Sequence, residues 1–488
     1  MTPVQSPFAT FIVVSDGPGA ARDRLLASLE THDVDVQLVQ AGDGLAIAIN
    51  SAAAGAATEF VAIVHPVGTV AASAVALVRD HFSANPSTGV YYADETRPVR
   101  RKRVSISKPS FSPERLRCQN YLGEVVFYRR DLFVATGGVN PALPGAELYD
   151  LALRCTRATD SVVHLDLDLF AHDAPSAPLL DAVALASTES ALSAHLAVTG
   201  GGVVRSVGAD GVHDTRRPVV GTPLVSIIIP TRGVHTDIDG ATRCFVIDAV
   251  RSIVDVSTWV DYEIVLVIDS VAEQSVVEEL VSIGGERVRF VEWDKPFNFS
   301  EKINLGAING RGEFVLLLND DVKVITPDWI ESLLALAQLP GAGMSGCMLY
   351  YADETIQHAG HHYFLGDVSH IGLDSPRGDP GPINGFRVER EVAGVTAACA
   401  MMPKSVFLEV GGLTNLLPGN FNDVDLCLKT VWQEHPIYWT PHAELYHFES
   451  KTRDASVHAF EIDVAWRRWG FMVEDSPLWP YPFSRPPT

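Results

Sequence analysis

Apolar, β-branched runs alternate with longer amphipathic segments through both halves of the chain. This alternation is typical of βα units built around a mostly parallel sheet. Strands are predicted in the first half at residues 11–14, 34–39, 60–64 and 90–92, and in the second half at 225–229, 263–268, 288–291, 314–318 and 343–350. Each half therefore predicts an α/β domain.

The segments between and beyond the two halves set the predicted domain limits. Residues 181–198 predict a helix, and the glycine- and proline-bearing stretch 200–223 predicts a linker. We expect a first domain over residues 1–180, a helix and linker over 181–222, a second domain over 223–455, and a C-terminal helix with a proline- and aromatic-rich tail over 456–488. Residues 376–382, rich in proline and glycine, predict a surface loop that is a candidate lid.

Four passages of the first half return in the second half in the same order. They are residues 59–61 and 313–315, the identical stretches 91–96 and 350–355, the glycine pairs 137–138 and 411–412, and residues 150–154 and 425–429. An ordered recurrence of this kind indicates duplicated domains. We expect residues kept in both copies to belong to the scaffold, and residues kept in one copy to be candidates for the active site.

Composition disfavours several classes of protein. A net charge of −23 argues against a nucleic-acid-binding surface, because polyanion binders need a positive balance. The longest apolar runs, at 225–229 and 314–318, are much shorter than the roughly 18 residues of a membrane span. The apolar stretch 8–14 has no preceding positive charge and no small-residue cleavage site, so it does not predict a signal peptide. Six cysteines without a CxxC pair fit reduced thiols, and we expect a cytoplasmic protein.

One cluster of positive charge stands out in this acidic chain. It comprises Arg97, Arg100, Arg101, Lys102 and Arg103. At about 1 kcal/mol per basic side chain near an anionic leaflet, the cluster would give weak peripheral attachment to the inner face of the plasma membrane. A solvated loop is the alternative interpretation.

Polar side chains follow three predicted strands of the second half. Pro230, Thr231 and Arg232 follow the strand at 225–229, Asp269 follows that at 263–268, and Asn319, Asp320 and Asp321 follow that at 314–318. Ligands of open parallel sheets bind beyond the carboxyl ends of the strands. We therefore expect these side chains to meet at one edge of the sheet, where they would bind a ligand.

Asp320 and Asp321 are adjacent carboxylates, which repel each other unless a divalent cation or hydrogen-bond donors offset the repulsion. Capping of the next helix is the alternative interpretation. That helix is predicted to begin with Thr326 as its cap and Pro327 at its first position, so it does not need the acidic pair. The pair therefore predicts a Mg²⁺ or Mn²⁺ site with positions left for phosphate oxygens.

The repeat assigns different roles to two aspartates in the motif 422–425. Asp425 has Asp150 as its counterpart, whereas Asp423 falls where the first half has Glu147 and Leu148. Asp425 is therefore interpreted as structural, and Asp423 as a candidate general base.

Histidines give a weaker signal. His447 ends a predicted strand and is a candidate metal ligand, although a lone histidine is more often structural. Four further histidines, without a cysteine pair or an HExxH helix beside them, do not predict zinc; they are His358, His361, His362 and His370.

Taken together, these residues resemble the family 2 glycosyltransferases, which are inverting enzymes with the GT-A fold that use nucleotide-sugar donors. The resemblance covers residues 223–453, and its motifs are 225–232, 297–300 with Asn304, 319–321, 356–360, 422–426 and 446–447. It implies tandem GT-A domains of the nucleotide-diphospho-sugar transferase type, similar to Rossmann folds, with a degenerate first domain in which His65, Pro66 and Val67 replace the acidic motif. That first domain would be catalytically silent and would contribute packing, acceptor positioning or membrane contact.

The resemblance also implies residue roles. Thr231, Arg232, Asp269, Asn298 and Asn304 would contact the uracil or thymine nucleotide of the donor, and Pro230, Ser300, Asn319 and Asp320 would complete the substrate site. Asp321 would be the principal metal ligand, His447 would bind the metal or the diphosphate, and Asp423 would be the catalytic base.

The implied activity is inverting transfer of a sugar from a UDP- or dTDP-sugar to a glycan or lipid-linked glycan acceptor, in cell-surface polysaccharide synthesis, with Mg²⁺ or Mn²⁺. One alternative is a non-catalytic protein that binds nucleotide sugars or glycans. A nucleotidyltransferase is the other alternative, but it would want a glycine-rich basic loop after the first strand, which residues 230–235 do not provide.

Overall fold

The computed structural model describes residues 7–42, 44–238, 241–448, 457–473 and 477–479. The chain divides into two compact units. The first comprises Met1–Arg216, Pro382–Asn384 and Pro477–Thr488, and the second comprises Arg217–Gly381 and Gly385–Ser476. The main division, after Arg216, falls within the predicted helix and linker. The predicted tail beyond residue 479 lies outside the described residues.

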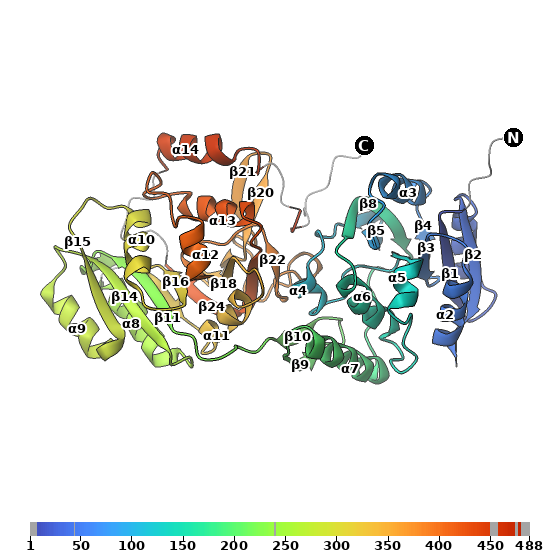
Figure 1. Ribbon diagram of the computed structural model, residues 1–488, viewed down its shortest axis with the longest axis horizontal. Helices are drawn as coiled ribbons and strands as arrows, with labels where there is room; N and C mark the ends of the chain where they lie inside the picture. Colours follow the sequence, from blue (N-terminus) through green and yellow to red (C-terminus); the bar gives the residue numbers. More distant parts are fainter. Residues whose placement is uncertain (1–6, 43, 239–240, 449–456, 474–476, 480–488) are drawn as a thin grey trace. The chain divides into compact units, whose positions relative to one another are not determined.

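The first unit is built on an eight-stranded mixed sheet (Figure 1). Its strand order is β2-β1-β3-β7-β5-β8-β4, with β6 paired to β5. The strands are β1 (Ala9–Ser15), β2 (Val34–Gln40), β3 (Phe60–Val64), β4 (Gly68–Val70), β5 (Val90–Val99), β6 (Lys102–Ile106), β7 (Val126–Arg129) and β8 (Val162–His172). The helices are α1 (Ala20–Leu29), α2 (Leu45–Gly55), α3 (Ala74–Ala84), α4 (Pro113–Leu116), α5 (Arg130–Ala135), α6 (Glu147–Arg157) and α7 (Ala182–Val198).

The predicted linker at 200–223 is only partly irregular. It contains an antiparallel hairpin of β9 (Val203–Val207) and β10 (His213–Arg216). These strands are short and half exposed, and β10 carries polar residues, so the segment has no apolar run that would have predicted a strand.

The second unit is built on a ten-stranded mixed sheet. Its strand order is β15-β14-β11-β16-β23-β18-β24-β17, with β19 paired to β18 and β22 paired to β24. The strands are β11 (Val225–Thr231), β14 (Tyr262–Asp269), β15 (Val288–Trp293), β16 (Phe314–Leu318), β17 (Val322–Val324), β18 (Met344–Tyr350), β19 (Ile356–His358), β22 (Arg390–Val392), β23 (Cys399–Pro403) and β24 (Ile437–His447). Two hairpins lie outside this sheet: β12 (Thr236–Ile238) with β13 (Ala241–Arg243), and β20 (His361–Phe364) with β21 (Asp367–His370).

Helices cover both faces of the second sheet (Figure 1). They are α8 (Phe245–Val256), α9 (Gln274–Gly284), α10 (Phe299–Asn309), α11 (Trp329–Ala337), α12 (Lys404–Glu409) and α13 (Asn422–Trp432). A further helix, α14 (Ala459–Trp469), contacts α13. Ile227 and Ile229 of β11 belong to the core formed with α8 and α11, whereas Ile228, on the other face, meets α10. A side chain at Gly306 of α10 would collide with Ile228, so this glycine permits close packing of helix on sheet.

The two sheets have the same strand order. β2, β1, β3, β7, β5, β8 and β4 of the first unit take the positions of β14, β11, β16, β23, β18, β24 and β17 of the second. The registers agree as well: Phe60 pairs with Arg129 as Phe314 pairs with Pro403. The second sheet adds β15 beyond β14. The α/β class predicted for both halves is confirmed, and the common strand order supports the interpretation of the sequence repeat.

Two predictions about loops of the second unit have different outcomes. The helix α11 begins at Trp329, with Asp328 at its N-cap, so the prediction of Thr326 as the cap and Pro327 at the first position is wrong. The Thr326 hydroxyl instead accepts the Glu444 N–H at 2.9 Å, because the chain here still runs beside β24. The predicted surface loop is present, and its Arg377 forms ion pairs with Glu354 and Glu444. The role of this loop as a lid stays a prediction.

Within the described residues, every helix is too short or too polar to cross a bilayer.

Candidate active site

A cavity of about 660 Å³ lies beyond the carboxyl ends of β11 and β16 in the second unit. Its lining includes predicted site residues from four separate segments: Pro230, Thr231, Arg232, Asn319, Asp320, Asp321, Asp423 and His447. The strands place the first two groups at one edge because β11 and β16 are parallel neighbours. Two of the three groups predicted to meet at one edge of the sheet therefore line the cavity, whereas Asp269, the third, does not.

Both members of the acidic pair line this cavity, with Asp321 buried and Asp320 half-buried. The Thr231 hydroxyl donates to Asp320 Oδ2 at 2.6 Å. Burial and the charge of neighbouring Asp321 raise the pKa of Asp320 to about 7. The two carboxylates therefore lie close together in a poorly hydrated place, where their repulsion favours either a proton or a cation.

The donor set around the pair fits a divalent metal ion. Asp321 is 5% exposed, and its Oδ1 lies 3.2 Å from His447 Nε2. Asn319 Oδ1 is buried without a hydrogen-bond partner among the described residues, and its amide nitrogen lies 3.0 Å from His447 Nε2. Several oxygens with one imidazole make a set suited to Mg²⁺ or Mn²⁺.

Gln357 orients His447. The Nδ1 of His447 lies 2.6 Å from Gln357 Oε1, and an amide oxygen only accepts, so we assign the imidazole proton to Nδ1. The lone pair of Nε2 is then directed toward Asp321 and Asn319. The motif 356–360 contains Gln357 but shows no role for it, because Gln357 and His447 are 90 positions apart in the sequence. They meet because β19 and β24 both pair with β18.

Asp423 lies in the first turn of α13 and lines the same cavity. It accepts the Val424 N–H at 2.8 Å through Oδ1 and the Ala397 N–H at 3.4 Å through Oδ2. Burial alone would raise the pKa of Asp423, but His361, His370, the Thr396 side chain and the Val424 N–H hold it below its usual value. Asp423 is therefore ionised at neutral pH, as a general base must be.

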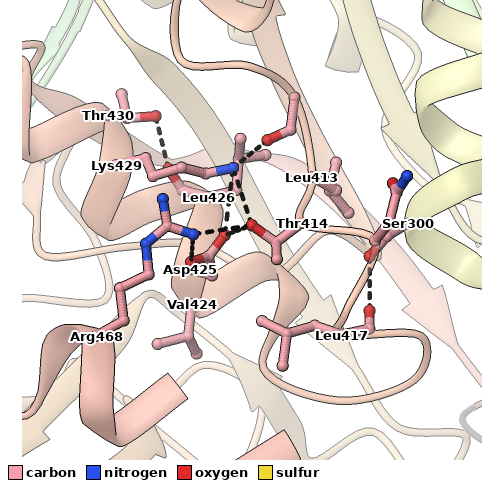
Figure 2. A network of polar contacts seen from close by, with 12 residues as sticks. Ser300, Leu413, Thr414, Leu417, Val424, Asp425, Leu426, Lys429, Thr430 and Arg468 are labelled. Carbon is pink, nitrogen blue, oxygen red and sulfur yellow. Dashed lines mark hydrogen bonds and ion pairs between the residues drawn. The ribbon is translucent and has the colours of Figure 1, made fainter. Parts of the chain in front are cut away.

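Asp425 lies two residues further along α13 and belongs to a network of polar contacts inside the unit (Figure 2). It is fully buried and makes ion pairs with Lys429 at 3.2 Å and Arg468 at 3.0 Å. Thr414 and the indole of Trp469 also donate to it. Asp425 does not line the cavity. These contacts agree with its interpretation as a structural residue.

Four residues predicted to contact the donor do not line the cavity: Asp269, Asn298, Ser300 and Asn304. Asp269 forms an ion pair of 2.5 Å with Lys302, whose ammonium also donates to the Thr231 carbonyl. Lys302 thus connects Asp269 to the cavity residue Thr231.

Asn298, Ser300 and Asn304 hold the loop 413–417 against α10. Asn298 donates to the Asn415 carbonyl at 2.9 Å, and Ser300 donates to the Leu417 carbonyl at 2.6 Å (Figure 2). Asn304 accepts the Leu413 N–H and donates to the Leu413 carbonyl, both at 2.8 Å. The geometry therefore supports a role in the scaffold for these three side chains, and their contact with a donor stays a prediction.

The cavity also contains residues that the sequence reasoning did not place there. They are Phe297, Phe299, Phe421, Thr396, Ala397, His361 and His370, among others. His358, His361 and His370 converge, with one ring nitrogen of each within 4.8 Å of the other two. Sequence spacing does not reveal this cluster, because it depends on the β20–β21 hairpin pairing His361 with His370.

Comparison with known proteins gives a match over part of the chain that lines this cavity, and Asp423 and His447 lie beyond that part. Residues 226–411 match the model of glycosyl transferase family 2. The chain is 33% identical over 470 residues to the uncharacterized protein y4gI of Sinorhizobium fredii, covering 91% of this chain and 51% of that protein. It is 29% identical over 457 residues to the O-antigen biosynthesis protein RfbC of Myxococcus xanthus, covering 90% of this chain and 35% of that protein. The chain thus spans about half of the first relative and about a third of the second.

Similarity to solved structures is lower. A complex of GalNAc-T7 with UDP, GalNAc and Mn²⁺ aligns with a TM-score of 0.40 at 12% identity, covering 51% of this chain and 48% of that one. The mannosyltransferase PcManGT of Pyrobaculum calidifontis, in complex with GDP-Man and Mn²⁺, aligns with a TM-score of 0.35 at 14% identity, covering 48% of this chain and 60% of that one.

Proposed function

We propose that the second unit, whose residues 226–411 match the model of glycosyl transferase family 2, transfers a sugar with inversion from a UDP- or dTDP-sugar to a hydroxyl of a glycan or lipid-linked glycan. One observation carries the proposal: the acidic pair with His447 and the ionised Asp423 line one cavity. A transferase needs both a site for a diphosphate and a base within reach of the acceptor. The name of the Myxococcus relative supports a place in cell-surface polysaccharide synthesis.

The donor's diphosphate would lie at the edge formed by Thr231, Arg232 and the acidic pair. Arg232 is exposed at the cavity wall and would contribute positive charge. Thr231 holds Asp320 in place. A divalent ion held by Asp321 and His447, with Asp320 beside them, would neutralise charge on the departing nucleoside diphosphate.

Asp423 would act on the acceptor. Its carboxylate takes the proton of the acceptor hydroxyl as that oxygen bonds to the anomeric carbon of the donor. The bond between the anomeric carbon and the diphosphate oxygen breaks in the same step, so the configuration inverts. A positioned base of this kind contributes about 10²- to 10⁴-fold to the rate.

Release of nucleoside diphosphate tests the proposal. The full chain would be incubated with Mn²⁺ and, in turn, UDP-glucose, UDP-galactose, UDP-N-acetylglucosamine and dTDP-rhamnose, with water as the acceptor. We expect metal-dependent release from at least one donor, abolished by Asp321→Asn. Thermal stabilisation by a donor without any release would instead favour the non-catalytic binding protein. Release of pyrophosphate from a nucleoside triphosphate would favour a nucleotidyltransferase.

For the first unit we propose a silent, supporting role as a degenerate glycosyltransferase domain at the cytoplasmic face of the membrane. His65, Pro66 and Val67 stand where the second unit has its acidic motif. Arg100, Arg101 and Lys102 are exposed at the β5–β6 turn, whereas Arg103 donates to the His172 carbonyl. These three exposed side chains, the basic tip of the turn, support weak contact with anionic lipid, with a binding free energy of about 1 kcal/mol per basic side chain. Co-sedimentation with vesicles containing phosphatidylserine, with and without charge reversal of the tip, would test this contact.

A further inference from the structure

Three mostly buried histidines lie beside Asp423. His358 ends β19, His361 begins β20 and His370 ends β21. His358 and His361 are each 1% exposed, and His361 and His370 line the cavity. Nothing in the proposed transfer step uses these rings, so their role needs a separate explanation.

The hydrogen bonds of His358 argue against a metal centre in this cluster. The Thr396 N–H donates to His358 Nε2 at 3.2 Å, so the neutral ring carries its proton on Nδ1. His358 Nδ1 lies 3.2 Å from His370 Nδ1, which is also 3.2 Å from the Gln357 carbonyl oxygen. A ring nitrogen ligates a metal only through its free lone pair. Metal binding at His358 Nδ1 would therefore break the bond from Thr396.

His361 is held so that one edge of its ring faces Asp423. Its Nδ1 lies 3.4 Å from the buried hydroxyl of Tyr363, and its Nε2 lies 3.9 Å from Asp423 Oδ2. With the Tyr363 hydroxyl donating to Nδ1, we assign the ring proton to Nε2, where it is directed toward the carboxylate.

Gly394 makes room for this arrangement. A Cβ at residue 394 would lie 2.6 Å from the Tyr363 hydroxyl oxygen and 2.7 Å from His361 Nδ1. Both distances are shorter than real contacts allow, so the absence of a side chain at 394 is a second, independent condition for the Tyr363–His361 pair.

The His361 ring that faces the Asp423 carboxylate is neutral at neutral pH. Burial lowers the pKa of His361 to about 4, against the raising effect of Asp423 and with a further lowering by His370. At neutral pH His361 therefore acts on Asp423 as an N–H donor and not as a full positive charge. A neutral donor orients a carboxylate without removing its basicity as strongly as a cation would.

We propose that His361 is a positioning residue, whose Nε2–H holds the carboxylate of Asp423 in the orientation that receives the acceptor's proton. The inference rests on the proposed function and deepens it. The 3.9 Å separation is longer than a hydrogen bond, and catalytic hydrogen bonds are often long before substrate binds. His358 and His370 pack beside His361 and complete the cluster that surrounds its ring.

The test compares two substitutions of His361 with a matched control. His361→Phe keeps an aromatic ring and removes the N–H, and His361→Gln keeps a neutral N–H donor. His362→Phe is the control, because consecutive residues of a strand point to opposite faces and His362 does not line the cavity. Turnover would be measured as release of nucleoside diphosphate, with Mn²⁺, from the donor panel named above.

We expect His361→Phe to lower kcat by about 10- to 100-fold, as a misplaced catalytic group does, with unchanged donor affinity. His361→Gln should recover part of the loss, and His362→Phe should match the wild type. Gly394→Ala should lower kcat in the same direction, because it displaces the Tyr363–His361 pair. His361→Gln and Gly394→Ala keep the proposal falsifiable if His361→Phe does not fold.

A double-mutant cycle separates positioning from an unrelated structural effect. If His361 acts through Asp423, adding His361→Phe to Asp423→Asn causes no further loss of kcat. An equal loss in both backgrounds, or wild-type turnover in both His361 variants, overturns the inference. Wild-type turnover in Asp423→Asn would refute the proposed function and this inference with it. A stoichiometric Zn²⁺ site found by titration calorimetry, and removed by His358→Ala, would make the cluster a metal centre and would also overturn the inference.

Discussion

Each unit has a histidine at the equivalent point of its own sheet, but the residues around the two histidines differ. His172 ends β8 and pairs with Gly68, the first residue of β4, just as His447 ends β24 and pairs with Val322, the first residue of β17. In the first unit His172 Nε2 contacts Glu95 Oε2 at 2.9 Å. In the second, His447 Nε2 faces Asp321. Because both units have the histidine, it belongs to the common scaffold. The two units differ in the acidic residue that contacts it.

The neighbouring charges are balanced in the first unit. Lys108 is buried, lies 3.3 Å from Glu95 and donates to the carbonyls of Ala93 and Leu122. Although burial works in the opposite direction, Lys108 and His172 lower the pKa of Glu95 to about 2. In the second unit, burial and the neighbouring Asp321 raise the pKa of Asp320 to about 7. One unit neutralises its buried acid with its own ammonium, whereas the other leaves an acidic pair suited to an external cation.

The largest expected effect comes from Asp423, which has no aspartate as its counterpart in helix α6, where Glu147 and Leu148 stand instead. Asp423→Asn keeps the shape of the side chain and removes the base, so kcat should fall by about 10²- to 10⁴-fold, or about 3 to 5 kcal/mol. Donor affinity, measured by titration calorimetry, should not change. The melting temperature should stay near that of the wild type. Loss of donor binding in place of turnover would remove Asp423 from the role of base.

Asp425, two residues further along α13, should respond in the opposite way. Asp425→Ala leaves Lys429 and Arg468 without their buried counter-charge (Figure 2), which costs about 3 to 5 kcal/mol of stability. Thermal or urea unfolding measures this loss. Asp150→Ala, at the matching position of α6, should destabilise the first unit, because it removes the 2.5 Å ion pair with Arg154. A wild-type melting temperature for Asp425→Ala would contradict the structural role.

The charge balance of the first unit predicts a dependence of stability on pH. The pKa of Glu95 is lowered from 4.5 to about 2 on folding, so its contribution is fully present above pH 4.5 and is lost as the pH falls toward 2. The shift corresponds to about 3 kcal/mol. Unfolding of the first unit should therefore become easier through this range, and Glu95→Gln should remove most of that dependence. An equal pH dependence in Glu95→Gln would show that another group is responsible.

The strands and the polar residues at their ends could be predicted from the sequence, because buried apolar runs mark β11, β14 and β16 directly. The roles of Thr326, Asn304 and His361 could not, because each depends on a partner brought close by the tertiary fold. Thr326 bonds Glu444, Asn304 bonds Leu413, and His361 faces Asp423. A local pattern shows which side chains can donate or accept, but not which distant backbone group will meet them.

The smallest expected effect concerns an asparagine that both units keep. Asn50 in α2 accepts the Val139 N–H at 2.7 Å and donates to the Val139 carbonyl at 2.9 Å, as Asn304 in α10 does with Leu413. Val139 and Leu413 each follow a pair of glycines with positive φ. We call this pair of hydrogen bonds, from the asparagine side chain to the residue after two glycines, the asparagine clamp. The clamp occurs both in the second unit, which has the candidate active site, and in the first unit, which lacks the acidic motif.

If the clamp is only structural, Asn304→Ala and Asn50→Ala should each cost about 1 to 3 kcal/mol, since each leaves a buried backbone group unsatisfied. The loss would be measured by urea unfolding of the full chain. Asn304→Ala should leave the KM for the donor unchanged at a temperature where the variant is folded. A raised KM with unchanged stability would instead place Asn304 in the donor site, as the resemblance to the family implies. Asn304 and Asn50 would then differ in function although they make the same hydrogen bonds.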